Sequence, residues 1–258
     1  MRNQKESDTK VKCAFIFDLD GTLVDTQLPF HAKVESEILA KHNVRITPEE
    51  LSERYAGRST REIFFELLPN HDPDELVKEK WYMLYGLLRF DLLSALPQML
   101  ETCLALKANG IPICIASASP QAWIEMCIDK MISIFEEDYL LMSKFRNIFG
   151  KRSVSAEECL KPKPAPDVFL LAKKELALRD PKDEIEWYVV GDGEADVIGG
   201  LAAGMKVLYL SATKRKYDRH PSVTRFTNSR ALAKYIINLI PELKNYKNGL
   251  TDKIVYKR

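Results

Sequence analysis

Four short apolar runs, each followed at once by small or polar residues, set the strongest limit on how this chain can fold. They are rich in β-branched and aromatic residues, which is typical of strands that are buried on both faces. The runs occupy residues 13–20 (CAFIFDLD), 111–119 (IPICIASAS), 187–193 (WYVVGDG) and 206–212 (KVLYLSA). Helical patterns lie next to them, at residues 97–110, 167–178 and 195–205. This alternation predicts βαβ units, and therefore an α/β fold with a Rossmann-like parallel sheet.

Residues 27–95 contain no such run and instead form long, charged, amphipathic stretches. Thr47 followed by Pro48 is a typical helix start, because threonine caps a helix and proline fits its first turn. We therefore expect about four helices, inserted as a smaller domain after the first strand. The predicted domains are a discontinuous core, residues 11–26 and 96–258, and a helical insertion, residues 27–95.

The charges are balanced over the whole chain, with 38 Lys and Arg against 37 Asp and Glu. This balance provides no general attraction to nucleic acid or to a membrane surface. Residues 211–258 are nevertheless rich in lysine and arginine. We interpret this stretch as a solvated basic surface or, alternatively, as a patch that attracts anionic ligands.

The cysteine pattern and the first residues of the chain allow a prediction of the cellular compartment. The 5 cysteines form no C-x-x-C pair, so we expect a reducing compartment, without a disulfide framework or a zinc site. Residues 1–10 are polar, and the apolar run after them is interrupted by Asp18. We therefore expect neither a signal peptide nor a membrane span, but a cytoplasmic protein whose first ten residues are frayed.

Two aspartates end the first predicted strand. Asp18 and Asp20 lie on one face, because strand side chains alternate, and Gly21 permits an immediate turn. Such residues can simply cap a strand end with solvated carboxylates or open an Asp-Gly hairpin. Placed close together and away from water, however, the two carboxylates would repel each other unless a cation were present.

A second group of acidic residues, Asp192, Glu194 and Asp196, follows another strand of the buried type. By itself this group can be a surface turn. In an open parallel sheet, however, the carboxyl ends of the strands meet at one edge, where ligands bind. Carboxylate oxygens are the ligands that Mg²⁺ prefers, and this cation would neutralise Asp18 and Asp192.

Two further segments carry groups suited to binding an anion. The second predicted strand ends in SAS, where the Ser117 hydroxyl and the backbone N–H of Ala118 can bind an anion, although small residues also close strands into turns. In KPKPAPDVF, the prolines stiffen the backbone in an extended form and present Lys161 and Lys163 from a fixed base, although a linker has the same composition. With a lysine and a cation beside the carboxylates, phosphate becomes a natural ligand.

In this order and spacing, DLDGTLVD, SAS, KPAPD and GDGEAD resemble the four motifs of the haloacid dehalogenase (HAD) superfamily. The resemblance covers residues 11–212, and the helical insertion resembles the C1 cap of that superfamily. It is strongest to the C1-capped phosphatases and the β-phosphoglucomutase group. Asp20 argues against the dehalogenase branch, which lacks an aspartate two residues after its nucleophile.

The resemblance implies a role for each residue that matches a motif. Asp18 would be the nucleophile that forms an aspartyl-phosphate, and Asp20 would be the general acid/base. Ser117 and the amide of Ala118 would bind phosphate oxygens. Lys163, which stands directly before PAPDVF, would stabilise Asp18 and the phosphoryl group in transfer.

The same resemblance implies a Mg²⁺ site. Asp18, Asp192 and the main-chain carbonyl of Asp20 would ligate the ion. Asp196 would be a second ligand or a partner of one.

Three residues of the insertion are candidates for contact with the substrate. Arg58 and Arg61, in YAGRSTREIF, can bind the non-reacting end of an anionic substrate or remain solvated. His31 is expected either to face the substrate or to be an ordinary surface histidine.

We therefore expect a Mg²⁺-dependent HAD phosphatase acting on a small phosphorylated metabolite, such as a sugar phosphate or a phosphoglycolate-like acid. The alternatives are a β-phosphoglucomutase-like phosphomutase and a catalytically silent HAD-like binding module. No nucleic-acid or membrane partner is expected, and the protein would be a monomer or a homodimer. The segment 129–160 is longer than the HAD pattern predicts, and its role is left open.

Overall fold

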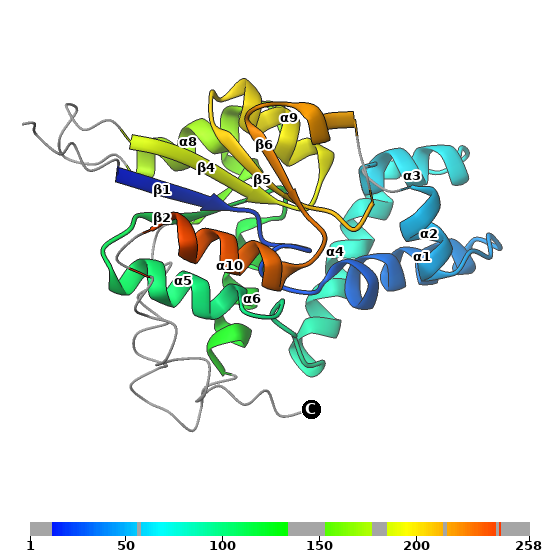
Figure 1. Ribbon diagram of the computed structural model, residues 1–258. Coiled ribbons are helices and arrows are strands. Elements are labelled where there is room, and N and C mark those ends of the chain that lie inside the picture. The colour runs from blue at the N-terminus through cyan, green and yellow to red at the C-terminus, as the bar shows by residue number, and fades with distance from the viewer. Residues whose placement is uncertain are drawn as a thin grey trace, which may run out of the picture.

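The protein contains a parallel sheet of six strands in the order β3-β2-β1-β4-β5-β6 (Figure 1). The structure is a computed structural model that describes residues 12–55, 58–133, 153–176, 185–213, 216–240 and 243. The strands are β1 (Lys12–Phe17), β2 (Ile113–Ser117), β3 (Ser153–Ser155), β4 (Ile185–Gly191), β5 (Lys206–Leu210) and β6 (Val223–Phe226). The α/β fold with a Rossmann-like parallel sheet is thus confirmed.

Helices cover both faces of this sheet (Figure 1). One face carries α5 (Met99–Ala108), α6 (Gln121–Ser133) and α10 (Ser229–Leu239). The other carries α8 (Asp167–Glu175) and α9 (Glu194–Ala202). Two short 3₁₀ turns, η2 (Ala156–Glu158) and η3 (Lys216–Arg219), complete the described core.

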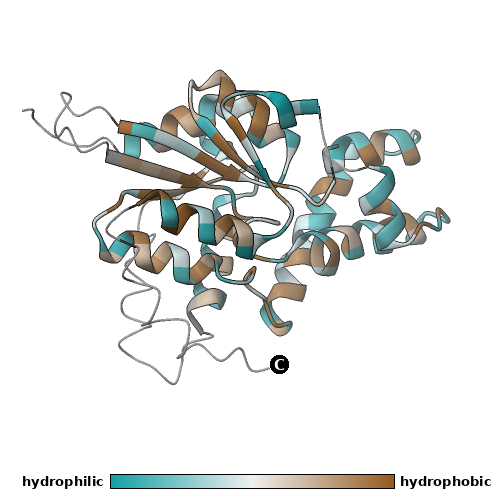
Figure 2. Cartoon of the chain, viewed as in Figure 1, coloured by the Kyte–Doolittle hydropathy of each residue, from teal (hydrophilic) through white to brown (hydrophobic). Residues whose placement is uncertain are grey.

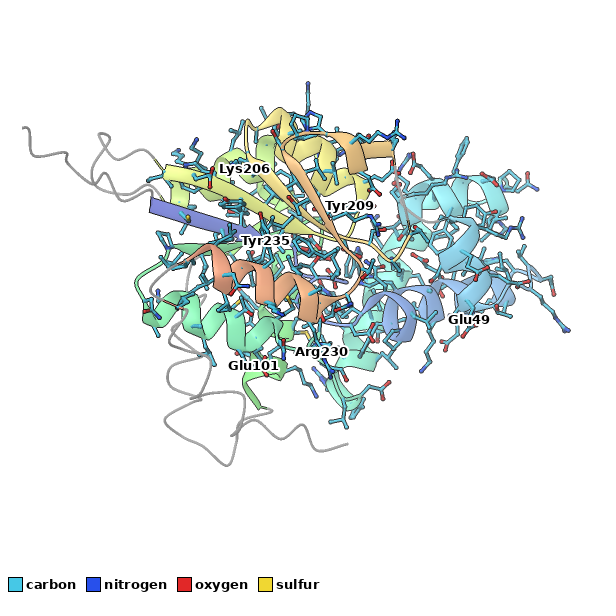
Figure 3. The ribbon with its side chains drawn as sticks, viewed as in Figure 1. Glu49, Glu101, Lys206, Tyr209, Arg230 and Tyr235 are labelled. Atoms are coloured by element: carbon cyan, nitrogen blue, oxygen red, sulfur yellow. The ribbon has the colours of Figure 1, made fainter. Side chains whose placement is uncertain are left out.

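The alternation of strand side chains explains why both faces are apolar. Phe15 and Phe17 of β1 point into the cluster beneath α5 and α10, whereas Ile16 points into the cluster beneath α8 and α9. Figure 2 shows the resulting concentration of hydrophobic residues along the sheet. At the margin, Tyr235 of α10 lies against Phe226 of β6, with ring centroids 5.0 Å apart (Figure 3).

The strand order places the functional edge of the sheet. The chain moves outward from β1 through β2 to β3, and then returns to the other side of β1 to form β4. Ligands in open parallel sheets bind beyond the carboxyl ends of the strands at such a point of reversal. The residues after β1 and β4 therefore occupy the position where a ligand is expected.

The described part of residues 27–95 forms helices beyond the carboxyl end of β1 (Figure 1). We refer to these helices as the cap. A π-helical segment, η1 (Gln27–Ala32), continues directly into α1 (Lys33–Lys41), and α2 (Pro48–Arg54), α3 (Thr60–Leu67) and α4 (Pro73–Phe90) follow. As predicted, Thr47 caps α2 with Pro48 in its first turn, and Glu50 completes a capping box.

The two connections between cap and core lie side by side. The backbone N–H of Asp25 donates to Ser94 O at 2.8 Å, and that of Leu96 donates to Leu23 O at 2.9 Å. Val24 and Ala95 form an antiparallel bridge between these bonds. The cap therefore leaves and rejoins the core at one place, directly after Asp20.

Some elements were not predicted from the sequence. β3 and the end of α6 lie inside the segment 129–160, of which residues 134–152 are outside the described residues. β6 and α10 lie in the basic stretch 211–258. The first ten residues, predicted to be frayed, are also outside the described residues. None of the described helices combines the length and the apolar composition needed to cross a membrane.

A buried ion pair stabilises the cap interior. Lys80 Nζ of α4 lies 2.7 Å from Glu35 Oε1 of α1, and both side chains are at most 9% exposed. Thr60 Oγ1 donates to the same oxygen at 2.6 Å. Burial acts to raise the pKa of Glu35, but the Lys80 ammonium outweighs it and holds this pKa below its ordinary value. Glu35 is therefore ionised inside the cap.

We predict that Lys80→Met lowers the free energy of unfolding by about 3–5 kcal/mol, because it leaves a buried carboxylate without its cation. Urea denaturation measures this loss. Lys78→Met is the matched control, because Lys78 pairs with Glu75 on the exposed side of the same helix, and a much smaller loss than in Lys80→Met is expected there. Equally small losses in both variants would contradict a charged pair in the cap interior.

Candidate active site

Three carboxylates meet at the carboxyl end of β1 and β4. One oxygen of each of Asp18, Asp192 and Asp196 lies within 4.8 Å of the others. Asp18 follows β1, Asp192 follows β4, and Asp196 lies in the first turn of α9. The cluster thus combines residues from the two places where the sequence predicted acidic strand ends.

Two glycines permit this close approach. Gly21 has φ +79°, and a Cβ there would lie 2.2 Å from Asp192 Oδ2. A Cβ on Gly191 would lie 2.4 Å from Asp196 Cγ. Any side chain at either position would displace a carboxylate, so the turn after β1 and the end of β4 require glycine.

Lys163 is the cation that the chain itself supplies to the cluster. Its Nζ donates to Asp18 Oδ1 at 2.6 Å, to Asp196 Oδ1 at 2.7 Å and to Ala116 O at 2.8 Å. Its side chain is 4% exposed, whereas Lys161 is exposed. The structure therefore brings Lys163, and not Lys161, to Asp18.

The segment before α8 is a turn and not the extended stretch that its prolines predicted. The backbone N–H of Ala165 donates to Pro162 O at 3.0 Å, and Pro166 has helical dihedral angles at the start of α8. The prolines fix this turn instead of an extended chain, and Lys163 lies within it.

Burial and mutual repulsion make the acidic cluster unfavourable when it is fully ionised. Burial raises the pKa of Asp18 to about 7, with Asp196 and Asp20 adding to the rise and Lys163 opposing it. Burial and the charges of Asp18 and Asp196 raise the pKa of Asp192 well above its ordinary value. Burial acts to lower the pKa of Lys163, but Asp18 and Asp196 outweigh it and raise this pKa.

Asp20 has a different environment, made of hydrogen-bond donors. Thr26 Oγ1 donates to Asp20 Oδ1 at 2.7 Å and Trp123 Nε1 donates to the same oxygen at 2.9 Å. His31 Nε2 lies 3.3 Å from Oδ1. Ser119 Oγ donates to Oδ2 at 2.6 Å. Ser117 Oγ lies 3.5 Å from Oδ2, so five side chains of the described residues approach this carboxylate.

These donors stabilise the ionised form of Asp20. Burial acts to raise its pKa, but the contact with His31 and the hydrogen bonds from Ser119 and Thr26 outweigh burial and hold the pKa well below its ordinary value. The pKa values of Asp18 and Asp20, two residues apart, are thus shifted in opposite directions: that of Asp18 is raised and that of Asp20 is lowered. Different environments of this kind let two neighbouring carboxylates take different chemical roles.

The acidic cluster fits a hard divalent cation. The donor set is made of carboxylate oxygens, which suit Mg²⁺. The raised pKa values of Asp18 and Asp192 reflect burial and repulsion between carboxylates, and a cation would offset both. Asp196 is already engaged, since Lys163 donates to its Oδ1 and the Gly193 N–H donates to its Oδ2 at 3.0 Å. Asp18 and Asp192 are therefore the carboxylates most open to an ion.

The remaining predicted residues lie as follows. Arg58 forms an ion pair with Glu66, and Arg61 with Asp74, both on the exposed surface of the cap. His31 is buried and contacts Asp20, so it is not an ordinary surface histidine.

Ala118 is exposed between the buried Ser117 and Ser119, just beyond the end of β2. Glu194 points toward Lys216, at 3.6 Å, and is not part of the acidic cluster.

Sequence reasoning missed three donors to Asp20: Thr26, Ser119 and Trp123. Ser119 follows Ser117 by two residues, so the reasoning that selected the Ser117 hydroxyl at the end of the second strand could also have selected Ser119. A buried tryptophan needs a partner for its N–H, but nothing in the sequence pointed to Asp20 as that partner for Trp123. The contact between Trp123 and Asp20 depends on how α6 packs against the turn after β1.

Comparison with known proteins identifies the family. A family model for haloacid dehalogenase-like hydrolases matches residues 14–204, well over half of the chain. The chain belongs to this family, and the prediction of a HAD-superfamily hydrolase is confirmed.

Several curated relatives are phosphatases. The chain is 28% identical over 247 residues to a bifunctional riboflavin kinase/FMN phosphatase of Arabidopsis thaliana, covering 93% of this chain but only 57% of that protein. It is 28% identical over 205 residues to a phosphoglycolate phosphatase of Haemophilus influenzae, covering 76% of this chain and 84% of the relative. Hexitol phosphatase A of Escherichia coli is 26% identical, with coverage of 77% and 82%.

Solved structures share the fold. A family IA HAD hydrolase from Entamoeba histolytica has a TM-score of 0.67 at 19% identity, covering 86% of this chain and 98% of that one. A HAD family hydrolase from Deinococcus radiodurans, with bound phosphate and sodium, has a TM-score of 0.56 at 21% identity, covering 89% of each chain. At these identities the likeness shows the fold alone.

The raised carboxyl pKa values predict an unusual dependence of stability on pH. Without divalent ions, the free energy of unfolding should fall as pH rises from about 4 to about 7. In this window Asp18 and Asp192 keep protons in the folded state that the unfolded chain, with an ordinary value of 3.8, has lost. The stabilisation is therefore present at low pH and lost as Asp18 ionises.

Urea denaturation across this window, in EDTA and in Mg²⁺, measures the effect. Mg²⁺ should reduce the loss, because it stabilises the ionised carboxylates. Asp18→Asn should flatten the dependence in EDTA, since it removes one of the titrating groups. A stability that rises with pH throughout the window in EDTA would contradict the prediction.

Proposed function

We propose that this protein is a Mg²⁺-dependent phosphatase that hydrolyses a small phosphorylated metabolite through an aspartyl-phosphate on Asp18. One observation carries the proposal: Asp18 belongs to the acidic cluster and accepts a hydrogen bond from the Lys163 ammonium group, while Asp20 accepts hydrogen bonds from a separate set of donors. Membership in the HAD-like hydrolases and the phosphatase names of the curated relatives support this class of enzyme.

Asp18 is the nucleophile in this proposal. One of its oxygens forms a bond to phosphorus as the bond between phosphorus and the ester oxygen breaks. Lys163, hydrogen-bonded to Asp18 Oδ1, fixes the direction of the carboxylate and places positive charge beside the transferring group. Asp18, Asp192 and the carbonyl of Asp20 would hold Mg²⁺, and the bound ion would supply further positive charge against the repulsion between carboxylate and phosphate.

Asp20 is the general acid/base. It gives a proton to the ester oxygen as the alcohol leaves, and later takes a proton from the water that attacks the aspartyl-phosphate. The second step releases inorganic phosphate and restores the Asp18 carboxylate. Proton transfer of this kind contributes roughly 10²–10⁴-fold to the rate.

The other residues bind or position. Ser117 and the amide of Ala118 are proposed to hold phosphate oxygens at the end of β2. Asp196 is proposed to position Lys163 and the backbone at Gly193, because its oxygens accept hydrogen bonds from both.

The cap is proposed to select the substrate. Arg58 and Arg61 are candidates for binding the anionic end of the substrate, provided that each leaves its present carboxylate partner. His31 lies beside Asp20, where the leaving group would lie.

The substrate class follows from the relatives and from the cap. Phosphoglycolate, glycerol 3-phosphate and hexitol phosphates, named for the relatives, are small phosphate esters. A helical cap that enters and leaves the core next to Asp20 limits the site to such small molecules. β-Phosphoglucomutase-type structures share the fold at 19% identity, which provides no argument for a mutase.

We predict that Asp18→Asn lowers phosphate release by roughly 10³-fold or more, because the amide cannot act as the nucleophile. Turnover of p-nitrophenyl phosphate and of a panel of small phosphate esters, in Mg²⁺ and in EDTA, measures this. Wild-type turnover that needs no divalent ion, or an active Asp18→Asn variant, would contradict the proposed chemistry. Absence of any turnover by the wild type would redirect the test to sugar monophosphates with a bisphosphate primer.

Lys163→Met should lower kcat/KM by roughly 10²–10³-fold, because the variant lacks the cation beside Asp18. Lys161→Met is the matched control: Lys161 precedes it by two residues, is exposed, and is expected to be dispensable. Circular dichroism on both variants separates a loss of folding from a loss of chemistry. Similar kinetics in the two variants would remove Lys163 from the proposed mechanism.

A further inference from the structure

We propose that Trp123 is a positioning residue for proton transfer: its indole N–H fixes the Asp20 carboxylate so that the other oxygen can serve the leaving group. The inference rests on the proposed function, because it assigns a residue outside the four motifs to the acid step of that reaction. It concerns a contact between α6 and the turn after β1.

Trp123 is held firmly where it meets Asp20. It lies in the first turn of α6 and is fully buried, and its Nε1 donates to Asp20 Oδ1 at 2.9 Å. Four aromatic rings surround its indole, with centroids between 5.5 and 6.3 Å away. They belong to Phe30, His31, Trp81 and Tyr85. The indole therefore has little freedom to turn away from Asp20.

The chemistry of the indole distinguishes it from the hydroxyl partners of Asp20. The indole N–H can only donate, whereas a hydroxyl can rotate and either donate or accept. Trp123 therefore requires a lone pair on Oδ1 at every stage. The hydroxyl of Ser119, 2.6 Å from Oδ2, can reverse its role when Oδ2 carries a proton. This asymmetry makes Oδ2 the oxygen that carries the proton and Oδ1 the fixed one.

The acid step then involves defined atoms. The bond between phosphorus and the ester oxygen breaks as Asp18 forms its bond to phosphorus. The proton on Asp20 Oδ2 moves to the ester oxygen, and Asp20 becomes a carboxylate whose Oδ1 keeps its bond from Trp123. Without the indole N–H, the remaining partners of Oδ1, the Thr26 hydroxyl and the His31 ring nitrogen, can accept as well as donate. Either oxygen can then carry the proton, and fewer molecules hold it toward the leaving group.

This role depends on the leaving group. An alkyl alcohol is a poor leaving group and needs the proton of Asp20 as its bond to phosphorus breaks. p-Nitrophenolate leaves readily without a proton. A residue that positions the acid should therefore matter for an alkyl ester and hardly matter for p-nitrophenyl phosphate. A residue that only supports the fold should affect both esters alike.

The test compares kcat/KM of Trp123→Phe and wild type, in Mg²⁺, for p-nitrophenyl phosphate and for the best alkyl phosphate of the panel. kcat/KM reports the steps up to release of the alcohol, where the acid acts. We expect about a tenfold or larger loss for the alkyl ester, as for the loss of a hydrogen bond to a charged group, and a much smaller loss for p-nitrophenyl phosphate. Trp81→Phe, in the same aromatic cluster, should change both esters by the same factor.

Equal losses for the two esters in Trp123→Phe, or no loss for either, would overturn the inference. If this variant does not fold, replacement of Trp123 by benzothienylalanine keeps the shape of the indole and removes only its N–H, and the same comparison applies. Failure of the proposed function is distinct, because wild-type protein would then release no phosphate from any ester. An active wild type with an unaltered ester ratio in the variant would overturn the role of Trp123 alone.

Discussion

The packing of three carboxylates around one buried ammonium group is the constraint on which the rest of the site depends. Asp18, Asp192 and Asp196 approach within 4.8 Å, and Lys163 bonds to two of them. When ionised, they leave two negative charges uncompensated in a buried site, which the charge of one divalent cation matches. The glycines at 21 and 191 permit the approach, and the chain places β1 and β4 side by side to create it. The acidic cluster is thus unfavourable when it is fully ionised, and a bound cation would relieve this cost.

Asp20 shows how the same turn gives a second carboxylate the opposite environment. Burial acts on both carboxyl groups, but neighbouring carboxylates add to its effect at Asp18, whereas hydroxyl, indole and imidazole groups surround Asp20. The pKa of Asp20 is therefore held low in this arrangement, and its role as an acid requires that a bound phosphate, or a change in the hydroxyl donors, lower the preference for the ionised form. Ser119 and Ser117, which can reverse their hydroxyls, are the partners that can accommodate this change.

The sequence predicted the features that repeat in local pattern, and not those that depend on packing. Buried strands read as apolar runs, so β1, β2, β4 and β5 were predicted near their observed positions. β3 and β6 have only 3 and 4 residues and carry serine, threonine or arginine, so no apolar run marks them. Lys163 was predicted because a motif surrounds it. The meeting of Trp123 and Asp20, 103 positions apart in sequence, depends on the angle at which α6 packs, which no local pattern encodes.

The cap contacts Asp20, the proposed acid/base, and this contact bears on the proposed mechanism. His31 of η1 contacts both Asp20 and Trp123, and Trp81 of α4 packs against both His31 and Trp123. The described environment of Asp20 therefore contains cap residues as well as core residues. A movement of the cap relative to α6 would change the contacts of Asp20, whereas Asp18, Asp192 and Lys163 belong to the core and would keep theirs. The proposed nucleophile, Asp18, thus has its contacts within the core, whereas the proposed acid/base, Asp20, has contacts in both the core and the cap. An enzyme so built can keep its nucleophile in place while the cap determines when the proton is correctly placed.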